Sequence, residues 1–307
     1  MFQDLDIRYD NAFRRASPKA DGVALLRRGD GVLASVLDGQ LHFPRFAQLS
    51  PAAQGLVWRY AFTLGEEEYF LADGDAAELE EISWIETPPH PSSGFRETPD
   101  GSFPASGRLE LVASKDYRNL GPKEAVFAAA VSESLHRWYG ANRYCGRCGQ
   151  PMQDSETERA RVCPACGLTV YPKICPAVIV AVTDGDRLLL TKYQGRAFRR
   201  YALVAGFAEI GEPIEDTVRR EVLEETGLRV KQIRFYKSQP WVFTDSLLLG
   251  FWCELDGSDA VTVQESELSE ARWHHRDEIP EDYSGISLTG EMIDAFRQGK
   301  EHLMREA

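Results

Sequence analysis

The sequence has few cysteines and no apolar run long enough to cross a membrane. Only six of its 307 residues are cysteine, too few for the disulfide framework of a small secreted protein. The longest apolar stretch, residues 174–182, has about half the length of a membrane-spanning helix. The first residues lack the basic and then apolar pattern of a secretory signal. These absences predict a cytoplasmic protein that does not cross a membrane.

Acidic residues outnumber basic residues. The chain has 35 lysines and arginines against 48 aspartates and glutamates, so its formal net charge is −13. Binding of duplex DNA needs a broad basic surface, which this balance argues against, although a small basic pocket for a phosphorylated molecule is compatible with it. The hydrophobic fraction of 43% is ordinary for a folded protein, and the length predicts two or three folding units.

The N-terminal third is predicted to be rich in β-structure. Short apolar runs alternate with Gly or Asp turns at residues 23–26, 32–36, 60–64 and 68–71. An acidic helix is expected around residues 75–82, and a proline-rich loop over residues 88–107. After Pro122, a helix is predicted from apolar residues at helical spacing, namely Phe127, Val131, Leu135 and Trp138.

The C-terminal part is predicted to form a mixed sheet between helices. Two strands, residues 175–182 and 187–191, are joined by a turn at residues 184–186. A further strand is expected at residues 247–254, and helices at residues 211–225 and 288–302. Strands that precede and follow an internal helix indicate helices packed on a sheet.

Four cysteines form two pairs with the spacing of a metal site. Fourteen residues separate the pairs, which are Cys145 with Cys148 and Cys163 with Cys166. Four thiolates fill every position around a tetrahedral Zn²⁺, so such a zinc ion is structural and not catalytic. Redox pairs or free structural thiols are the alternatives. The other two cysteines, Cys175 and Cys253, lie in apolar strands and are expected in the core.

A glutamate-rich helix carries the strongest chemical signal. Its start is expected near Pro213 and its end at Gly227, and Glu221, Glu224 and Glu225 share one sector of about 100°. Carboxylates this close repel each other. Glu225 also lies beside an apolar stripe, where a charge needs a counter-charge such as a hard divalent cation. The alternative is a solvated acidic helix face.

The full spacing, G-x5-E-x7-R-E-x-x-E-E-x-G from Gly206 to Gly227, resembles the signature of the Nudix hydrolases at every fixed position. The resemblance implies a loop–helix–loop that holds two or three Mg²⁺ or Mn²⁺ ions and activates water against a diphosphate. It implies Glu221, Glu224 and Glu225 as catalytic residues. Glu221 and Glu225 are then metal ligands, and Glu224 is a ligand or the general base. The carbonyl of Ala205 and the late Glu267 are further implied ligands, with Glu265 and Glu270 as rivals of Glu267.

A second motif follows the glutamates. Residues 238–246 resemble the SQPWPFPxS array of the NADH pyrophosphatase branch, with Val242 and Thr244 in place of two prolines. That exchange predicts a less rigid loop. Without the resemblance, a buried loop is the simpler interpretation. The resemblance implies substrate contacts from Gln239, Pro240, Trp241, Val242, Phe243, Thr244, Asp245 and Ser246. It adds Glu158, Tyr171, Phe207, Arg118 and Thr289.

Together the motifs predict an α+β chain with an α-β-α sandwich Nudix fold. The expected parts are a Nudix-like β-rich domain (1–110), a connecting helix (111–140), a zinc ribbon (141–170) and a catalytic domain (171–307). The implied activity is hydrolysis of NAD(H) to AMP and nicotinamide mononucleotide, and also of the NAD cap on RNA 5′ ends. One structural Zn²⁺ per subunit and a homodimer are implied as well. An ADP-ribose or nucleotide-sugar diphosphatase and a non-catalytic nucleotide sensor are the alternatives.

Overall fold

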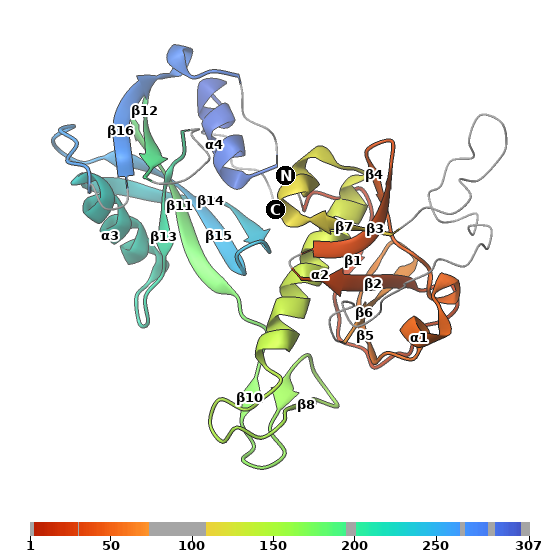
Figure 1. Ribbon diagram of the computed structural model, residues 1–307. Coiled ribbons are helices and arrows are strands. Elements are labelled where there is room, and N and C mark those ends of the chain that lie inside the picture. The colour runs from red at the N-terminus through yellow and green to blue at the C-terminus, as the bar shows by residue number, and fades with distance from the viewer. Residues whose placement is uncertain are drawn as a thin grey trace. The chain divides into compact units, whose positions relative to one another are not determined.

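The computed structural model describes residues 3–29, 31–73, 109–194, 201–264, 268–281 and 286–301 (Figure 1). The chain forms two compact units, one of Leu5–Lys173 and one of Met1–Asp4 with Ile174–Ala307. The helix predicted at residues 75–82 and the loop predicted at residues 88–107 lie outside the described residues. Within the described ranges, no helix has the length and apolarity that a membrane crossing requires.

The first unit is built on a seven-stranded sheet. Six strands lie in the order β1-β5-β6-β2-β3-β4, and β7 pairs with β3. Their bounds are Tyr9–Asp10 (β1), Val23–Arg28 (β2), Gly31–Leu37 (β3), Gln40–His42 (β4), Trp58–Leu64 (β5), Glu67–Ala72 (β6) and Glu110–Ala113 (β7). The four strands predicted here are therefore confirmed. Short helices α1 (Pro51–Gln54), η1 (Phe46–Gln48) and η3 (Ser114–Asn119) connect them.

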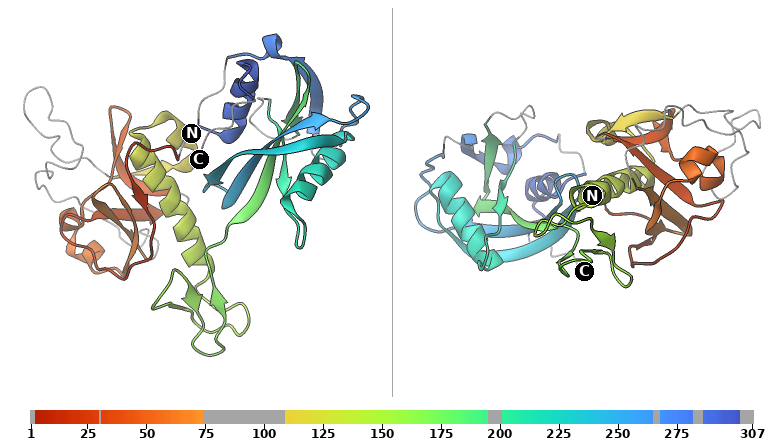
Figure 2. Two further views of the ribbon diagram at one scale, coloured as in Figure 1. Left: turned by 180° about the vertical axis from the view of Figure 1, so that it is seen from behind. Right: turned by 60° about the horizontal axis from the view of Figure 1, so that its bottom comes forward.

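Helix α2 (Lys123–Ala141) contacts β2 to β5. It leads into the ribbon, as the left view of Figure 2 shows. Its predicted apolar face is confirmed at Phe127, Val131 and Trp138, which are buried. The ribbon consists of three two-residue strands, β8 (Gln153–Asp154), β9 (Arg161–Val162) and β10 (Thr169–Val170).

Ion pairs fasten the ribbon to the sheet of its own unit. Arg59 on β5 donates from Nε to Asp154 on β8 at 2.6 Å, and Asp154 also pairs with Arg161 on β9. Arg159 adds a bond to the carbonyl of Ala61 at 2.5 Å. The ribbon and the N-terminal sheet are thus one packed body.

The second unit contains the predicted mixed sheet. The order is β14-β15-β11-β12-β16, and β13 pairs with β11. The strands are Cys175–Asp184 (β11), Arg187–Tyr193 (β12), Val204–Phe207 (β13), Val230–Trp241 (β14), Ser246–Leu255 (β15) and Leu268–His275 (β16). Strands β11 and β15 run parallel and the other pairs antiparallel. Strands β13, β14 and β16 were not predicted.

Helices cover both faces of this sheet, which confirms the α-β-α sandwich (Figure 1). Helix α3 (Ile214–Thr226) buries Val218 and Val222 against one face. Helix α4 (Leu288–Arg297) buries Met292 and Phe296 against the other. The predicted end of the last helix, residue 302, is wrong: α4 ends at Arg297 because Gly299 turns left-handed, with φ of 68°.

Candidate active site and zinc centre

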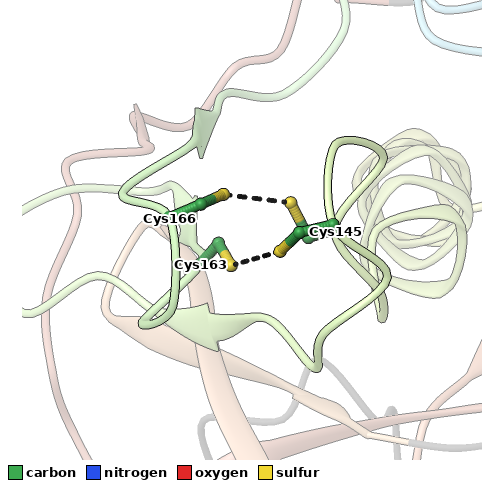
Figure 3. Close-up of side chains that lie close together, drawn as sticks. Cys145, Cys163 and Cys166 are labelled. Atoms are coloured by element: carbon green, nitrogen blue, oxygen red, sulfur yellow. Dashed lines mark hydrogen bonds between the residues drawn. The ribbon is translucent and has the colours of Figure 1, made fainter.

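The four cysteines converge in the ribbon (Figure 3). Their sulfur atoms all lie within 4.8 Å of one another. The Sγ atoms of Cys145 and Cys166 are 3.6 Å apart, and those of Cys148 and Cys163 are 3.5 Å apart. A tetrahedron with Zn–S bonds of about 2.3 Å has edges of about 3.8 Å. The cluster therefore fits a structural Zn²⁺, as the sequence predicted.

Two matching turns bring these sulfurs together. In each turn the glycine after the second cysteine is left-handed, with φ of 72° at Gly149 and 73° at Gly167. Its N–H donates to the carbonyl of the first cysteine, at 2.8 and 2.9 Å. Desolvation opposes ionisation of Cys145, but bonds from the backbone N–H groups of Arg147 and Cys148 and from the neighbouring thiols together lower the pKa of this thiol to about 6. The N–H of Gln150 lowers the pKa of Cys148, but bonds with the other three sulfurs outweigh it and raise this pKa, so without a metal the proton stays on Cys148 rather than on Cys145.

In the second unit, Gly206 at the end of β13 meets Glu221 on α3. A Cβ atom at Gly206 would lie 1.9 Å from Cδ of Glu221 and 2.1 Å from each of its carboxylate oxygens. Only glycine leaves room for that carboxylate against the backbone. The helix that delivers it begins at Ile214, after Pro213, and ends at Gly227, whose φ is 71°. Both predicted ends are confirmed.

Arg220 is the centre of the hydrogen-bond network around the glutamates. Its guanidinium donates to both carboxylate oxygens of Glu212, at 2.8 and 2.9 Å. It also donates to Glu221 at 2.7 Å and to Glu224 at 3.0 Å. The Arg220 bonds, helped by the hydroxyl of Thr217, lower the pKa of Glu212 to about 2. These contacts offset the repulsion between neighbouring carboxylates and fix their direction.

The three glutamates differ in burial. Glu225 is 1% exposed and Glu221 8% exposed, whereas the side chain of Glu224 is 53% exposed. Glu225 lies on the same helix face as the buried Val218 and Val222, as predicted. Burial in this position suits carboxylates that hold a cation, and the exposure of Glu224 suits contact with water or substrate.

The carbonyl of Ala205, the residue before Gly206, is a further predicted oxygen ligand. The neighbouring Ala205 pairs with Ile179 of β11, and its carbonyl accepts a bond from the hydroxyl of Tyr193 at 3.4 Å. Carboxylates and a carbonyl are the ligands that Mg²⁺ and Mn²⁺ prefer, so the donor chemistry fits the predicted cations. Within the described ranges, however, only the cysteine group brings three or more metal-ligating side chains within 4.8 Å of one another. The carboxylates of α3 are therefore more widely spaced than the four sulfur atoms of the ribbon.

The predicted late ligand, Glu267, lies outside the described residues, as does Glu265. The residue before them is tied to the glutamate helix, because Gln264 donates its N–H to the carbonyl of Glu225 at 3.1 Å. The other rival, Glu270, is engaged elsewhere: it accepts bonds from Lys192 at 3.1 Å and Tyr201 at 2.9 Å. Glu267 stays the predicted late ligand, with Glu265 and Glu270 as its rivals.

The predicted substrate array forms a hairpin tip. Residues through Trp241 belong to β14, and Ser246 begins β15. The rings of Trp241 and Phe243 meet edge to face with centroids 5.0 Å apart. Thr244, which stands where the family array has a proline, donates its N–H to the carbonyl of Trp241 at 3.2 Å, and its hydroxyl bonds Ser246 at 2.9 Å. Proline could not make either bond, so hydrogen bonds here replace the fixed φ angle.

Gln239 of this array is fully buried, with 0% exposure. Its Oε1 accepts the N–H of Leu288 at 2.7 Å. Its Nε2 donates to the carbonyl of Ile286 at 3.0 Å and to the side chain of Gln3 at 2.9 Å. The amide predicted to contact substrate thus holds the start of α4. Its neighbour Pro240 is exposed, and Val242, Phe243 and Asp245 lie at the tip.

The remaining predicted contacts are placed as follows. In the first unit, the exposed Tyr171 donates its hydroxyl to Glu158 at 2.9 Å, a bond that raises the pKa of Tyr171. In the second unit, Phe207 is 55% exposed at the end of β13, and Thr289 lies in the first turn of α4. Arg118 is in η3, and its side chain lies outside the described residues. Sequence reasoning named Glu158 and Tyr171 separately and missed that they bond.

Comparison with known proteins identifies two regions of the chain. The NUDIX domain family matches residues 173–296, and the NADH pyrophosphatase zinc ribbon domain matches residues 141–171. A relative from Actinobacillus succinogenes, named NAD-capped RNA hydrolase NudC, is 41% identical over 189 residues, which cover 58% of this chain and 71% of the relative. The chain belongs to the Nudix hydrolase family. Its ribbon is that of the NADH pyrophosphatase branch, as predicted.

Other Nudix proteins match over shorter lengths. A NAD-capped RNA hydrolase NudC from Salmonella paratyphi C is 40% identical over 146 residues, 48% of this chain and 56% of the relative. The match therefore spans about half the length of such relatives. The crystal structure of a Nudix hydrolase from Nitrosomonas europaea has a TM-score of 0.45 and 23% identity, and covers 52% of this chain and 93% of that one.

Proposed function

We propose that this Nudix hydrolase cleaves the diphosphate bond of NAD(H), giving AMP and nicotinamide mononucleotide, and that it removes the NAD cap from RNA 5′ ends. The observation that carries the proposal is the pair of buried carboxylates on α3, Glu221 and Glu225, of which Glu221 lies between the Gly206 backbone and the Arg220 guanidinium. The zinc ribbon and the array at residues 238–246 support NAD as substrate, as do the names of the relatives.

Different residues are proposed to hold the metal, to accept the proton and to stack on the bases. Glu221, Glu225 and the Ala205 carbonyl are the proposed metal holders, joined by Glu267. Bound Mg²⁺ or Mn²⁺ neutralises the diphosphate and lowers the pKa of a water molecule. Arg220 orients Glu221 and Glu224, and the exposed Glu224 is available to accept a proton. The rings of Phe207, Trp241 and Phe243 are proposed to stack on the bases.

Two other functions are the alternatives to NAD(H) hydrolysis: one has a different substrate, and the other has no catalytic activity. Val242 and Thr244 depart from the family array, which favours an ADP-ribose or nucleotide-sugar diphosphatase as the second candidate. A non-catalytic sensor has no need for two buried, mutually repelling carboxylates, so Glu221 and Glu225 argue against it.

Turnover tests the proposal. With Mn²⁺, we expect NADH, NAD⁺ and NAD-capped RNA to be cleaved faster than ADP-ribose, and Glu225→Gln to lose most of kcat. Glu215→Gln, an exposed acid on the first turn of the same helix, is the matched control. Cleavage of ADP-ribose about tenfold faster than NADH would favour the second candidate.

The proposal extends to a cytoplasmic homodimer, in which Glu158 and Tyr171 contact the dinucleotide. Glu158 and Tyr171 bond each other directly and Tyr171 is 55% exposed, which supports a surface to which the dinucleotide can bind. Light scattering gives the oligomeric state. Tyr171→Phe removes the bond to Glu158 but keeps the ring, so it separates stacking from hydrogen bonding as the source of any rise in KM.

A further inference from the structure

Tyr193 is the last residue of β12, and it lies on the face of the sheet that α3 covers. Its half-buried ring packs against the hydrophobic cluster that contains Val218 and Val222 of α3. The register of β12 against β16 shifts just before Tyr193, which is opposite Leu268. Such β-bulges often lie next to active sites, where they change the direction of a side chain.

The Tyr193 hydroxyl lies between two backbone carbonyls. Its oxygen is 3.4 Å from the carbonyl oxygen of Leu203 and 3.4 Å from that of Ala205. Leu203 immediately precedes β13 and Ala205 is the second residue of that strand, so the two carbonyls point to the same side of the extended chain. A hydroxyl has one proton, and a proton shared by two acceptors gives longer contacts than a single hydrogen bond. The hydroxyl therefore holds both carbonyls in one direction.

The peptide group that the hydroxyl contacts leads directly to Gly206. A Cβ atom at Gly206 would lie 1.9 Å from Cδ of Glu221, so that carboxylate packs against the backbone here. One peptide group thus connects the Tyr193 contact, the Ala205 carbonyl and the Glu221 carboxylate. A carbonyl oxygen has two lone pairs, so the bond from Tyr193 leaves one of them for a cation.

We propose that Tyr193 is a positioning residue of the metal site, and that its hydroxyl keeps the Ala205 carbonyl oriented for Mg²⁺ or Mn²⁺. The inference rests on the proposed function, in which Ala205 is one of the metal holders. A phenylalanine at this position keeps the ring but loses the donor, so the peptide group between Ala205 and Gly206 gains freedom to rotate. Metal binding must then restore an orientation that the wild type already has, and the affinity falls.

Calorimetric titration of the zinc-loaded full chain with Mn²⁺, without substrate, tests this role. The wild type should bind Mn²⁺ at a site that Glu225→Gln removes. Tyr193→Phe should raise the Kd of that site about threefold or more, as expected for the loss of one neutral hydrogen bond. Tyr236→Phe is the matched control, because it removes a hydroxyl that donates to Glu291 at 3.0 Å on the α4 face of the sheet. It should bind Mn²⁺ as the wild type does.

Turnover of NADH separates positioning of the metal from a purely structural role. The Mn²⁺ concentration that gives half the maximal rate should rise in Tyr193→Phe by the same factor as the Kd. At saturating Mn²⁺, kcat and the KM for NADH should stay within about twofold of the wild type. A general loss of packing would instead change kcat and KM as well.

An unchanged Kd for Mn²⁺ in Tyr193→Phe overturns the proposal, and so does an equal rise in Tyr236→Phe. Absence of Mn²⁺ binding by the wild type overturns the proposed function together with this inference, whereas an unchanged Kd in Tyr193→Phe leaves the proposed function intact. Thermal unfolding shows whether each variant is folded. Tyr193→Met also lacks the donor and should show the same rise, so wild-type affinity in this variant overturns the proposal even where Tyr193→Phe does not fold.

Discussion

The carboxylate of Glu221 occupies the space that a side chain at residue 206 would need. A Cβ atom there would lie 1.9 Å from Cδ of Glu221, well inside the closest approach of two carbon atoms. The first glycine of the Nudix signature therefore has a direct steric role. It lets an acidic group rest against the backbone beside the Ala205 carbonyl.

Gly206→Ala should remove activity while the fold persists. The added methyl group pushes Glu221 away, and a displacement of about 1 Å at a reacting site can lower the rate about 100-fold. The measurement is kcat with Mn²⁺, together with circular dichroism. Gly140→Ala is the control, because no atom lies within 4 Å of a Cβ atom built at that glycine of α2. Full activity in Gly206→Ala would contradict the role given to Glu221.

Glu212 should give the protein a specific acid sensitivity. Its pKa falls from 4.5 to about 2 in the folded state, chiefly through Arg220. As pH falls, the unfolded chain takes up this proton first, so the stabilisation is complete above about pH 4.5 and disappears towards about pH 2. The difference in Tm between wild type and Glu212→Gln should shrink over that range. A difference for Glu212→Gln that stays constant between about pH 4.5 and about pH 2 would exclude this linkage.

Gln239→Ala should destabilise the fold more than it affects substrate binding. It leaves the buried N–H of Leu288 and the carbonyl of Ile286 without a partner, at about 1–3 kcal/mol each. We expect the free energy of unfolding to fall by about 2–4 kcal/mol in urea titrations. KM for NADH, measured well below Tm, should change less than about twofold. Ser238→Ala, at an exposed neighbour, is the control. A large rise in KM with unchanged stability would instead support the predicted substrate contact.

Cys163→Ser should abolish zinc binding. Cys163 is 0% exposed, and the hydrophobic cluster of the ribbon has three buried members, Cys145, Met152 and Cys163. A hydrophobic cluster of this size depends on metal–ligand bonds for its stability. Elemental analysis should find one zinc per chain in wild type and in Cys175→Ser, which lies outside the ribbon, and none in Cys163→Ser. Retention of zinc by Cys163→Ser would remove this residue from the ligand set.

Features with local signals could be predicted from the sequence. Pro213 and Gly227 set the ends of α3, and the period of Val218, Val222 and Glu225 placed a carboxylate beside the core. The cysteine spacing was sufficient for the zinc cluster. Each of these depends on residues close together in the chain, where helix and turn geometry apply directly.

Features that depend on distant partners could not be predicted. Gln239 bonds Leu288, 49 residues away, and Gln3, 236 residues away. Strand β14 was missed because it carries charged residues such as Lys231 and Arg234 and lacks a clear alternation. Thr244 was expected to loosen its loop, yet its N–H and hydroxyl both bond within it. The sequence shows which polar groups are present, but only the fold shows which partners they bond.

Asp154 in the ribbon pairs with both Arg59 on β5 and Arg161 on β9. Zinc binding therefore affects the stability of the neighbouring sheet as well as that of the ribbon. If the ribbon unfolds, Arg59, whose side chain is only 13% exposed, loses the carboxylate of Asp154 and keeps only that of Asp73. Removal of the zinc by a chelating agent should therefore slightly destabilise the sheet that contains β5, although that sheet supplies none of the four cysteine ligands.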